Sequence, residues 1–154
     1  MHKICTDIII EAPLNVVWDQ MTDFEGFEKW NSFYTNIYGK LEPGSKIKVL
    51  MHPPGMKVNE LNPVVTKIDT MRELRWMGEL WIKGIFDSEH AFRLEGLEDN
   101  RTRLINCEKF KGILAPLILL LIGEKIKEGF NIMNHELKRQ CEMKREITQS
   151  VPLA

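Results

Sequence analysis

The chain has 154 residues, of which 44% are hydrophobic and 28% are charged, and its formal net charge at pH 7 is -1. This composition is that of a globular protein and excludes an intrinsically disordered chain. The length is close to that of one common domain, so a single core is expected without a structural metal. Basic and acidic residues alternate along most of the sequence, so we expect no nucleic-acid-binding face.

The sequence predicts neither export nor an integral membrane span. Residues 4–10 contain Thr6 and Asp7 and are too short and too polar for a signal peptide. The most apolar stretch, 113–122, is about ten residues long and contains Pro116, whereas a spanning helix needs about twenty. Its expected place is the core or an interface.

Neither a metal nor a cofactor is expected. The histidines outside the strands, His2, His52 and His135, do not converge with other ligand types, and no glycine-rich phosphate loop is present. The three cysteines are far apart and form no CxxC pair. We interpret Cys5, Cys107 and Cys141 as reduced thiols of a cytoplasmic protein.

The first elements in chain order are a strand and two short helices. Residues 4–11 have high β propensity and alternate loosely. Ala12-Pro13 then opens a segment, 14–21, whose apolar residues fall at helical spacing. Phe27 and Trp30 form a second short helical turn after the break at 23–26.

From about residue 37 to residue 110 the pattern is strand, turn, strand, and it predicts five or six antiparallel strands. Turn signals such as Pro43-Gly44, Asp69-Thr70 and 98–100 separate the apolar runs. Pro63 marks an irregular point or an edge, because proline cannot donate to a strand ladder.

The last segment, from about 114 to 147, predicts one long amphipathic helix. Its apolar stripe consists of Ile122, Ile126, Phe130, Met133, Leu137 and Cys141. Because such a helix needs a large surface to lie on, we expect it to cover the sheet in an α+β domain over 1–147, with a tail at 148–154. Gly123 and Gly129 inside it suggest close backbone approach to the sheet or a ligand, or a break near Gly123.

A wider pattern covers nearly the whole chain. It includes Trp18, Asp23-Phe24, Trp30-Asn31-x-Phe33, Gly39, Gly44, Pro63-x-Val65, Glu73-Leu74-Arg75-Trp76-x-Gly78, Phe86-x-x-Glu89-His90-x-Phe92, Thr102-Arg103-Leu104, Glu108-x-Phe110-x-Gly112 and Gly129-Phe130-x-x-Met133-Asn134-x-x-Leu137-Lys138. The sequence resembles the SRPBCC group of the START-like superfamily, which includes polyketide cyclases, pathogenesis-related allergens and lipid-transfer domains. The resemblance implies a helix-grip fold, a curved antiparallel sheet wrapped on the long C-terminal helix, with an apolar cavity for a lipid-like or polycyclic molecule. That superfamily hosts binding proteins and enzymes alike.

Strand alternation directs two ionisable side chains into this interior. Arg103 and Lys109 should face water, which turns Glu108 inward, and the parity of the preceding strand turns His90 inward as well. A three-residue turn, 98–100 or 99–101, then brings His90 opposite Glu108 or one diagonal step away. This pair is the candidate for acid–base catalysis or for anchoring a ligand, unless it only fixes strand register.

The remaining candidate ligand-binding residues follow from the same parity and from the helix stripe. The full set is Trp30, Phe33, Met51, Trp76, Phe86, Ser88, His90, Phe92, Asn106, Glu108, Phe110, Ile126, Phe130 and Met133. The leading hypothesis is a protein that binds or carries a hydrophobic small molecule. A cyclase- or dehydratase-like enzyme using His90 and Glu108 is the alternative, and a membrane-peripheral or protein-interaction module is the third.

The third hypothesis depends on Leu117 to Ile122, a run that is almost entirely apolar. This run is interpreted as a lid on the cavity, a homodimer interface or a peripheral membrane contact. The sequence leaves open whether the protein is a monomer or a homodimer.

Overall fold

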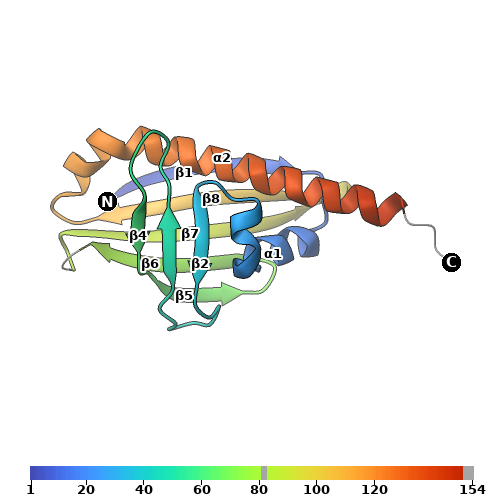
Figure 1. Ribbon diagram of the computed structural model, residues 1–154, viewed down its shortest axis with the longest axis horizontal. Helices are drawn as coiled ribbons and strands as arrows, with labels where there is room; N and C mark the ends of the chain where they lie inside the picture. Colours follow the sequence, from blue (N-terminus) through green and yellow to red (C-terminus); the bar gives the residue numbers. More distant parts are fainter. Residues whose placement is uncertain (81–82, 151–154) are drawn as a thin grey trace.

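The computed structural model describes residues 1–80 and 83–150 as a curved antiparallel sheet with one long helix lying along it (Figure 1). The elements are β1 (His2–Ile10), α1 (Leu14–Thr22), the 3-10 helix η1 (Phe24–Lys29), β2 (Tyr34–Tyr38), β3 (Lys48–Met51), β4 (Asn59–Leu61), β5 (Val64–Asp69), β6 (Glu73–Leu80), β7 (Phe86–Leu97), the short 3-10 turn η2 (Glu98–Asn100), β8 (Arg101–Lys111) and α2 (Ala115–Ser150). The α+β helix-grip architecture is therefore confirmed. Among the described residues, no helix is long and apolar enough to cross a membrane.

The strands form a five-stranded sheet in the order β1-β8-β7-β6-β5 and a three-stranded sheet in the order β2-β3-β4. In Figure 1 the strands of the smaller sheet run across those of the larger one. Between about residues 37 and 110, the described residues contain the six strands β3 to β8, which agrees with the prediction of five or six, and β2 begins before that range. The shortest, β4, has three residues, too few for a recognisable alternation.

Pro63 lies where the chain passes from the smaller sheet to the larger one. Its carbonyl accepts a hydrogen bond from the Ile47 amide, and Val65 donates to the Ser45 carbonyl, so backbone bonds still join the two sheets at this point. At position 63 the backbone pairing uses the carbonyl oxygen, so a proline, which has no N–H to donate, is tolerated there. β5, which begins directly after it, is an edge strand of the larger sheet.

The helix α2 packs its apolar stripe on the inner face of the sheet. Phe130, Met133, Leu137 and Cys141 have no measurable exposure, and Ile126 is 4% exposed. The helix is continuous through Gly123 and extends to Ser150, beyond the expected end at 147. Residues 151–154 of the expected tail lie outside the described residues.

Gly129 allows a close contact between the backbone of α2 and the rest of the molecule. The ring of Phe33 lies directly against the helix backbone at Gly129, in the space that a Cβ atom would need. At Gly123, by contrast, a Cβ would meet Ile4 at 3.8 Å, an ordinary van der Waals distance. Only Gly129 is therefore required for close approach.

Two of the three cysteines form a disulfide, and the prediction of reduced thiols was wrong for them. Cys5 lies opposite Cys107 in the antiparallel pairing of β1 with β8, and their sulfur atoms are bonded. The two residues are 102 positions apart in sequence, and only the pairing of the first strand with the last brings them together. Cys141 is free, and burial raises the pKa of its thiol to about 12, which keeps it protonated.

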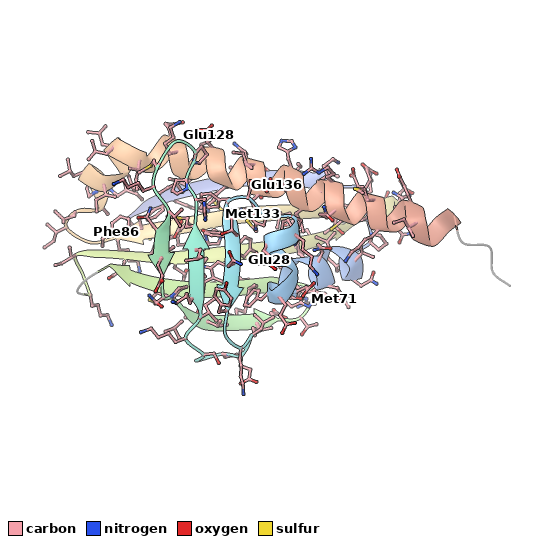
Figure 2. The ribbon with its side chains drawn as sticks, viewed as in Figure 1. Glu28, Met71, Phe86, Glu128, Met133 and Glu136 are labelled. Atoms are coloured by element: carbon pink, nitrogen blue, oxygen red, sulfur yellow. A yellow bond between two sulfur atoms is a disulfide. The ribbon has the colours of Figure 1, made fainter. Side chains whose placement is uncertain are left out.

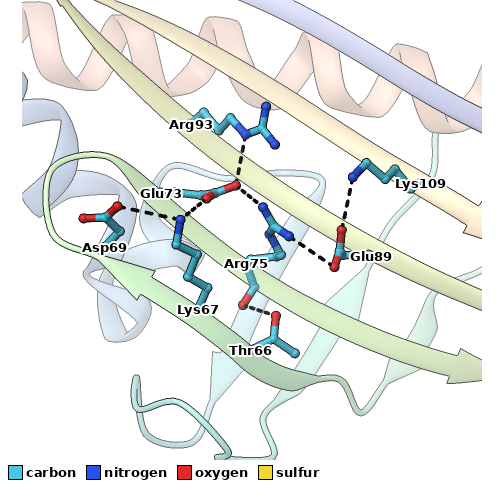
Figure 3. Close-up of polar contacts among 8 residues, drawn as sticks. All are labelled: Thr66, Lys67, Asp69, Glu73, Arg75, Glu89, Arg93 and Lys109. Carbon is cyan, nitrogen blue, oxygen red and sulfur yellow. Dashed lines mark hydrogen bonds and ion pairs between the residues drawn. The ribbon is translucent and has the colours of Figure 1, made fainter.

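The outer face of the sheet carries an ion-pair network centred on Glu73 (Figure 3). The carboxylate of Glu73 is 2.6 Å from Lys67 Nζ, 2.6 Å from an Arg75 guanidinium nitrogen and 2.9 Å from Arg93 Nε. Burial by itself would raise the pKa of Glu73, but the three hydrogen bonds dominate and lower it from 4.5 to about 2. Arg75 and Lys109 extend the network to Glu89.

Replacing Glu73 should change how stability depends on pH. Because the folded-state pKa of Glu73 is depressed, its contribution is complete above pH 4.5 and is lost as the pH falls toward 2. The wild-type protein should therefore lose about 2 kcal/mol more than Glu73→Gln across this interval. Urea unfolding at a series of pH values measures the difference, and parallel curves for the two proteins would refute it.

Substituting the two helix glycines by alanine should have opposite effects. Gly123→Ala should raise the free energy of unfolding by about 0.5–1 kcal/mol, because alanine is the better helix former. Gly129→Ala should lower it by about 1–3 kcal/mol, because the new methyl group displaces the ring of Phe33. Thermal and urea unfolding of both variants provide the test, and equal stabilisation would contradict the packing described.

Candidate ligand-binding site

A small polar cluster lies in the interior between the sheet and α2. His90 on β7 pairs directly with Glu108 on β8, as the strand parity predicts, with His90 Nδ1 3.7 Å from Glu108 Oε2. His90 is completely buried, and the Glu108 side chain is 12% exposed. The hydroxyl of Tyr34, from β2, lies 3.2 Å from the same Nδ1 atom. Both sheets therefore contribute to the cluster.

Tyr34 stays a neutral phenol in this environment. Burial raises its pKa well above the ordinary value of 10.0, and the nearby charge of Glu108 raises it further. A neutral phenol can donate its proton to His90 Nδ1. In the tautomer that accepts this proton at Nδ1, the imidazole N–H is at Nε2.

Several buried polar atoms have no hydrogen-bond partner among the described residues, and they include His90 Nε2, Asn106 Oδ1 and Trp30 Nε1 of the predicted site residues. Asn106 uses its amide nitrogen to donate to Asn134 on α2, which donates in turn to the hydroxyl of Thr6. His90 and Asn106 face the same side of neighbouring strands and are offset by one inward-facing position. An unsatisfied buried group costs about 1–3 kcal/mol, so the pair favours a guest that can bond to both.

The surroundings of His90 are aromatic. The centroid of its ring is 4.3 Å from that of Phe92, 4.9 Å from that of Phe130 and 5.4 Å from that of Trp76. Tyr34 completes this shell at 5.7 Å. The cluster therefore lies in a region of low polarity, where hydrogen bonds and charges have strong effects.

The structure gathers most of the predicted site residues in this interior. Trp30, Phe33, Trp76, His90, Phe92, Asn106, Phe110, Ile126, Phe130 and Met133 are buried, whereas Met51, Phe86, Ser88 and Glu108 are partly exposed. Trp30 packs mainly on the 3-10 helix, with its ring 4.9 Å from that of Phe27.

Three polar partners of the site were not among the predicted residues: Tyr34, Asn134 and Thr6. Tyr34 lies on β2, a strand that the pattern did not delimit. Asn134 could have been identified from the sequence, because it follows Phe130 by four positions and is therefore a polar residue on the buried side of α2. Thr6 is an inward-facing polar residue of β1 and could have been identified by strand alternation.

Burial along the interior is graded from one end to the other. On β7, Phe92 and Leu94 are buried, whereas Phe86 and Ser88 nearer the start of the strand are partly exposed. Figure 2 shows Phe86 at the same end of the molecule as the start of α2. The interior is therefore more accessible to solvent at this end than near Phe92 and Leu94.

The interior itself is occupied by side chains. The rings of Phe33, Tyr34 and Phe130 pack against one another, with centroids 4.6 Å and 5.7 Å apart for the two contacts that Phe33 makes. Aromatic side chains therefore fill this part of the interior. A shallow hollow lies on the solvent side of α2, beside Glu124, Lys127 and His135.

Comparison with known proteins gives a family and a fold. The family model described as polyketide cyclase / dehydrase and lipid transport matches residues 1–142. No curated protein matches the sequence.

Among solved structures, the chain is similar to the Zhui aromatase/cyclase from Streptomyces sp. R1128, with 14% identity, a TM-score of 0.74 and coverage of 92% of this chain and 93% of that one. A hypothetical protein from Helicobacter pylori shares 18% identity at a TM-score of 0.74, covering 91% and 88%. A START superfamily protein from Mycobacterium smegmatis shares 16% identity at a TM-score of 0.70, covering 93% and 99%. At these identities the structural likeness establishes the fold, and the match of the family model shows that the chain belongs to the polyketide cyclase / dehydrase and lipid transport family, of the SRPBCC, START-like type.

Proposed function

We propose that this protein binds a hydrophobic small molecule, lipid-like or polycyclic, that carries a hydroxyl group and lies between the five-stranded sheet and α2. The observation that supports this most is the pair of fully buried, unpartnered polar atoms, His90 Nε2 and Asn106 Oδ1, in an aromatic interior. The family to which the chain belongs includes cyclases and lipid-transport proteins, which is consistent with such a ligand.

A hydroxyl group suits this pair because it is both an acceptor and a donor. Its oxygen can accept the proton of His90 Nε2 while its own proton is donated to Asn106 Oδ1. Tyr34 holds the imidazole in the required orientation through Nδ1. Phe92, Trp76 and the other rings then contact the apolar body of the guest, where offset or edge-to-face packing is favourable.

Entry of a guest requires side chains to move, because rings now fill the interior. The partly exposed residues Met51, Phe86 and Ser88 are the ones with the most freedom to do so. Met51 is unbranched and adaptable, which suits a site that changes shape on binding. The bound ligand therefore replaces aromatic packing in the core with its own apolar surface.

Matched ligands that differ by one hydroxyl group test the anchor. The wild-type protein should bind a hydroxylated polycycle at least tenfold more tightly than the same molecule without the hydroxyl, because only the first satisfies the two buried atoms. His90→Phe and Asn106→Leu should each reduce this preference to less than threefold. Quenching of tryptophan fluorescence, with Trp76 in the site, measures both affinities.

Phe92→Leu is the matched control, since it alters the volume of the same interior but removes no hydrogen-bonding group. It should weaken both ligands about equally and leave the preference for the hydroxyl unchanged. Equal affinity of the wild-type protein for the two ligands would contradict the anchor, as would the same loss of preference in the control.

A cyclase- or dehydratase-like activity is the second candidate, and it depends on the hydrogen bond of Tyr34 to His90 with Glu108 nearby. This candidate uses the other tautomer of His90, in which Nδ1 carries the proton beside Glu108 and Nε2 is free. Nε2 then takes a proton from the carbon next to a substrate carbonyl, the electron pair of the broken C–H bond passes to the enolate, and the charge of Glu108 stabilises the imidazolium that forms. Turnover of a polyketide thioester that is lost in Glu108→Gln would support it. Tight binding without turnover would contradict the enzyme candidate, and only the carrier function would then be supported.

Localisation and oligomeric state stay predictions. The cytoplasmic location expected from the sequence has to be weighed against the Cys5–Cys107 disulfide, which is more typical of oxidising compartments. The principal partner in the proposal is the small molecule, bound by a single copy of the chain.

A further inference from the structure

The start of α2 exposes a group of large aliphatic side chains. Ile113 is 85% exposed, Leu117 57%, Leu120 82% and Leu121 73%. We call these four residues the α2 patch. Isolated apolar residues on a protein surface are ordinary, but three on the first turns of α2 together with Ile113 just before the helix indicate a contact surface.

The first turns of α2 are apolar on both sides. Leu119 and Ile122 pack on the core and cover the interior at this end. Leu117, Leu120 and Leu121 follow the spacing i, i+3, i+4 and face solvent together. A helix segment that is apolar all round is normally buried on all sides, so the exposed side lacks its usual covering.

The α2 patch adjoins the more accessible end of the interior. The amide of Ile113 donates to the carbonyl of Gly84, and the amide of Leu114 donates to the carbonyl of Ile85, directly before Phe86. These bonds hold the start of α2 against the beginning of β7. Whatever covers the patch therefore lies beside the partly exposed residues of the candidate site.

The size and composition of the patch fit a lipid bilayer better than a second protein. A stable protein interface needs about 800 Å² from each partner and is anchored by Trp, Tyr or Arg, whereas four aliphatic side chains cover only a few hundred Å². Insertion into a bilayer requires apolar side chains and no matching shape.

The charges around the patch are mixed. Lys83, Lys111 and Lys125 are exposed near it, as is the carboxylate of Glu124, and Lys125 pairs with Glu128 at 3.1 Å. Such a rim gives little net attraction to an anionic surface. The binding energy should therefore come from the aliphatic side chains and should not require acidic lipids.

We infer that the α2 patch inserts into the interface of a phospholipid bilayer, so that the accessible end of the interior faces the membrane. This inference is independent of the proposed ligand, because bilayer contact needs only the surface residues. A protein that fails to bind any small molecule could still bind vesicles by this surface.

Co-sedimentation of the protein with phosphatidylcholine vesicles provides the test. The wild-type protein should sediment with the vesicles, and Leu120→Gln/Leu121→Gln should reduce the partition coefficient at least tenfold. Leu97→Gln/Met143→Gln is the matched control, because Leu97 and Met143 are exposed apolar residues, 37% and 51%, that lie away from the start of α2. The control should sediment like the wild type.

Three outcomes would overturn the inference: no sedimentation of the wild-type protein, an equal loss in the control, or a dimer that the patch substitutions dissociate. Analytical ultracentrifugation without lipid detects the third outcome. Because every substituted side chain is exposed, the variants should keep the wild-type circular dichroism spectrum and melting temperature, which the same samples can confirm.

Discussion

The pairing of β7 with β8 is the constraint on which the candidate site depends. The two strands are joined by Glu98–Asn100, where Asp99 and Asn100 adopt φ values of 60° and 54°. Asp and Asn tolerate this left-handed region better than most residues, so the short turn closes and the register follows from it. A slip of one residue would turn His90 and Glu108 to opposite faces.

The polar groups on the two faces of the sheet differ in how fully they are paired. On the outer face, Glu73 is surrounded by three cations and remains ionised to low pH. On the inner face, His90 has one hydrogen-bond partner on one nitrogen and none on the other among the described residues. Glu73 on the outer face has three cationic partners, although Arg75 Nε beside it is buried without a hydrogen-bond partner among the described residues. On the inner face, His90 Nε2 and Asn106 Oδ1 are the atoms that could pair with a guest.

Much of this fold and part of the site could be predicted from the residues. Alternation along two long strands was enough to turn His90 and Glu108 inward together, opposite each other or one diagonal step apart, and the structure has the direct pairing. Helical spacing was enough to identify α2. Tyr34 could not be assigned, because its strand crosses from the other sheet and its role depends on tertiary geometry. The bond between Cys5 and Cys107 was missed for a related reason, since the order of strands in the sheet is not a local property.

Native mass spectrometry of the purified protein, followed by organic extraction, tests the central claim most directly. The account predicts a mass excess from one bound molecule and an extract containing a stoichiometric apolar compound with a hydroxyl group. A protein at its unliganded mass that also takes up no member of a panel of hydroxylated lipids and polycycles would contradict it.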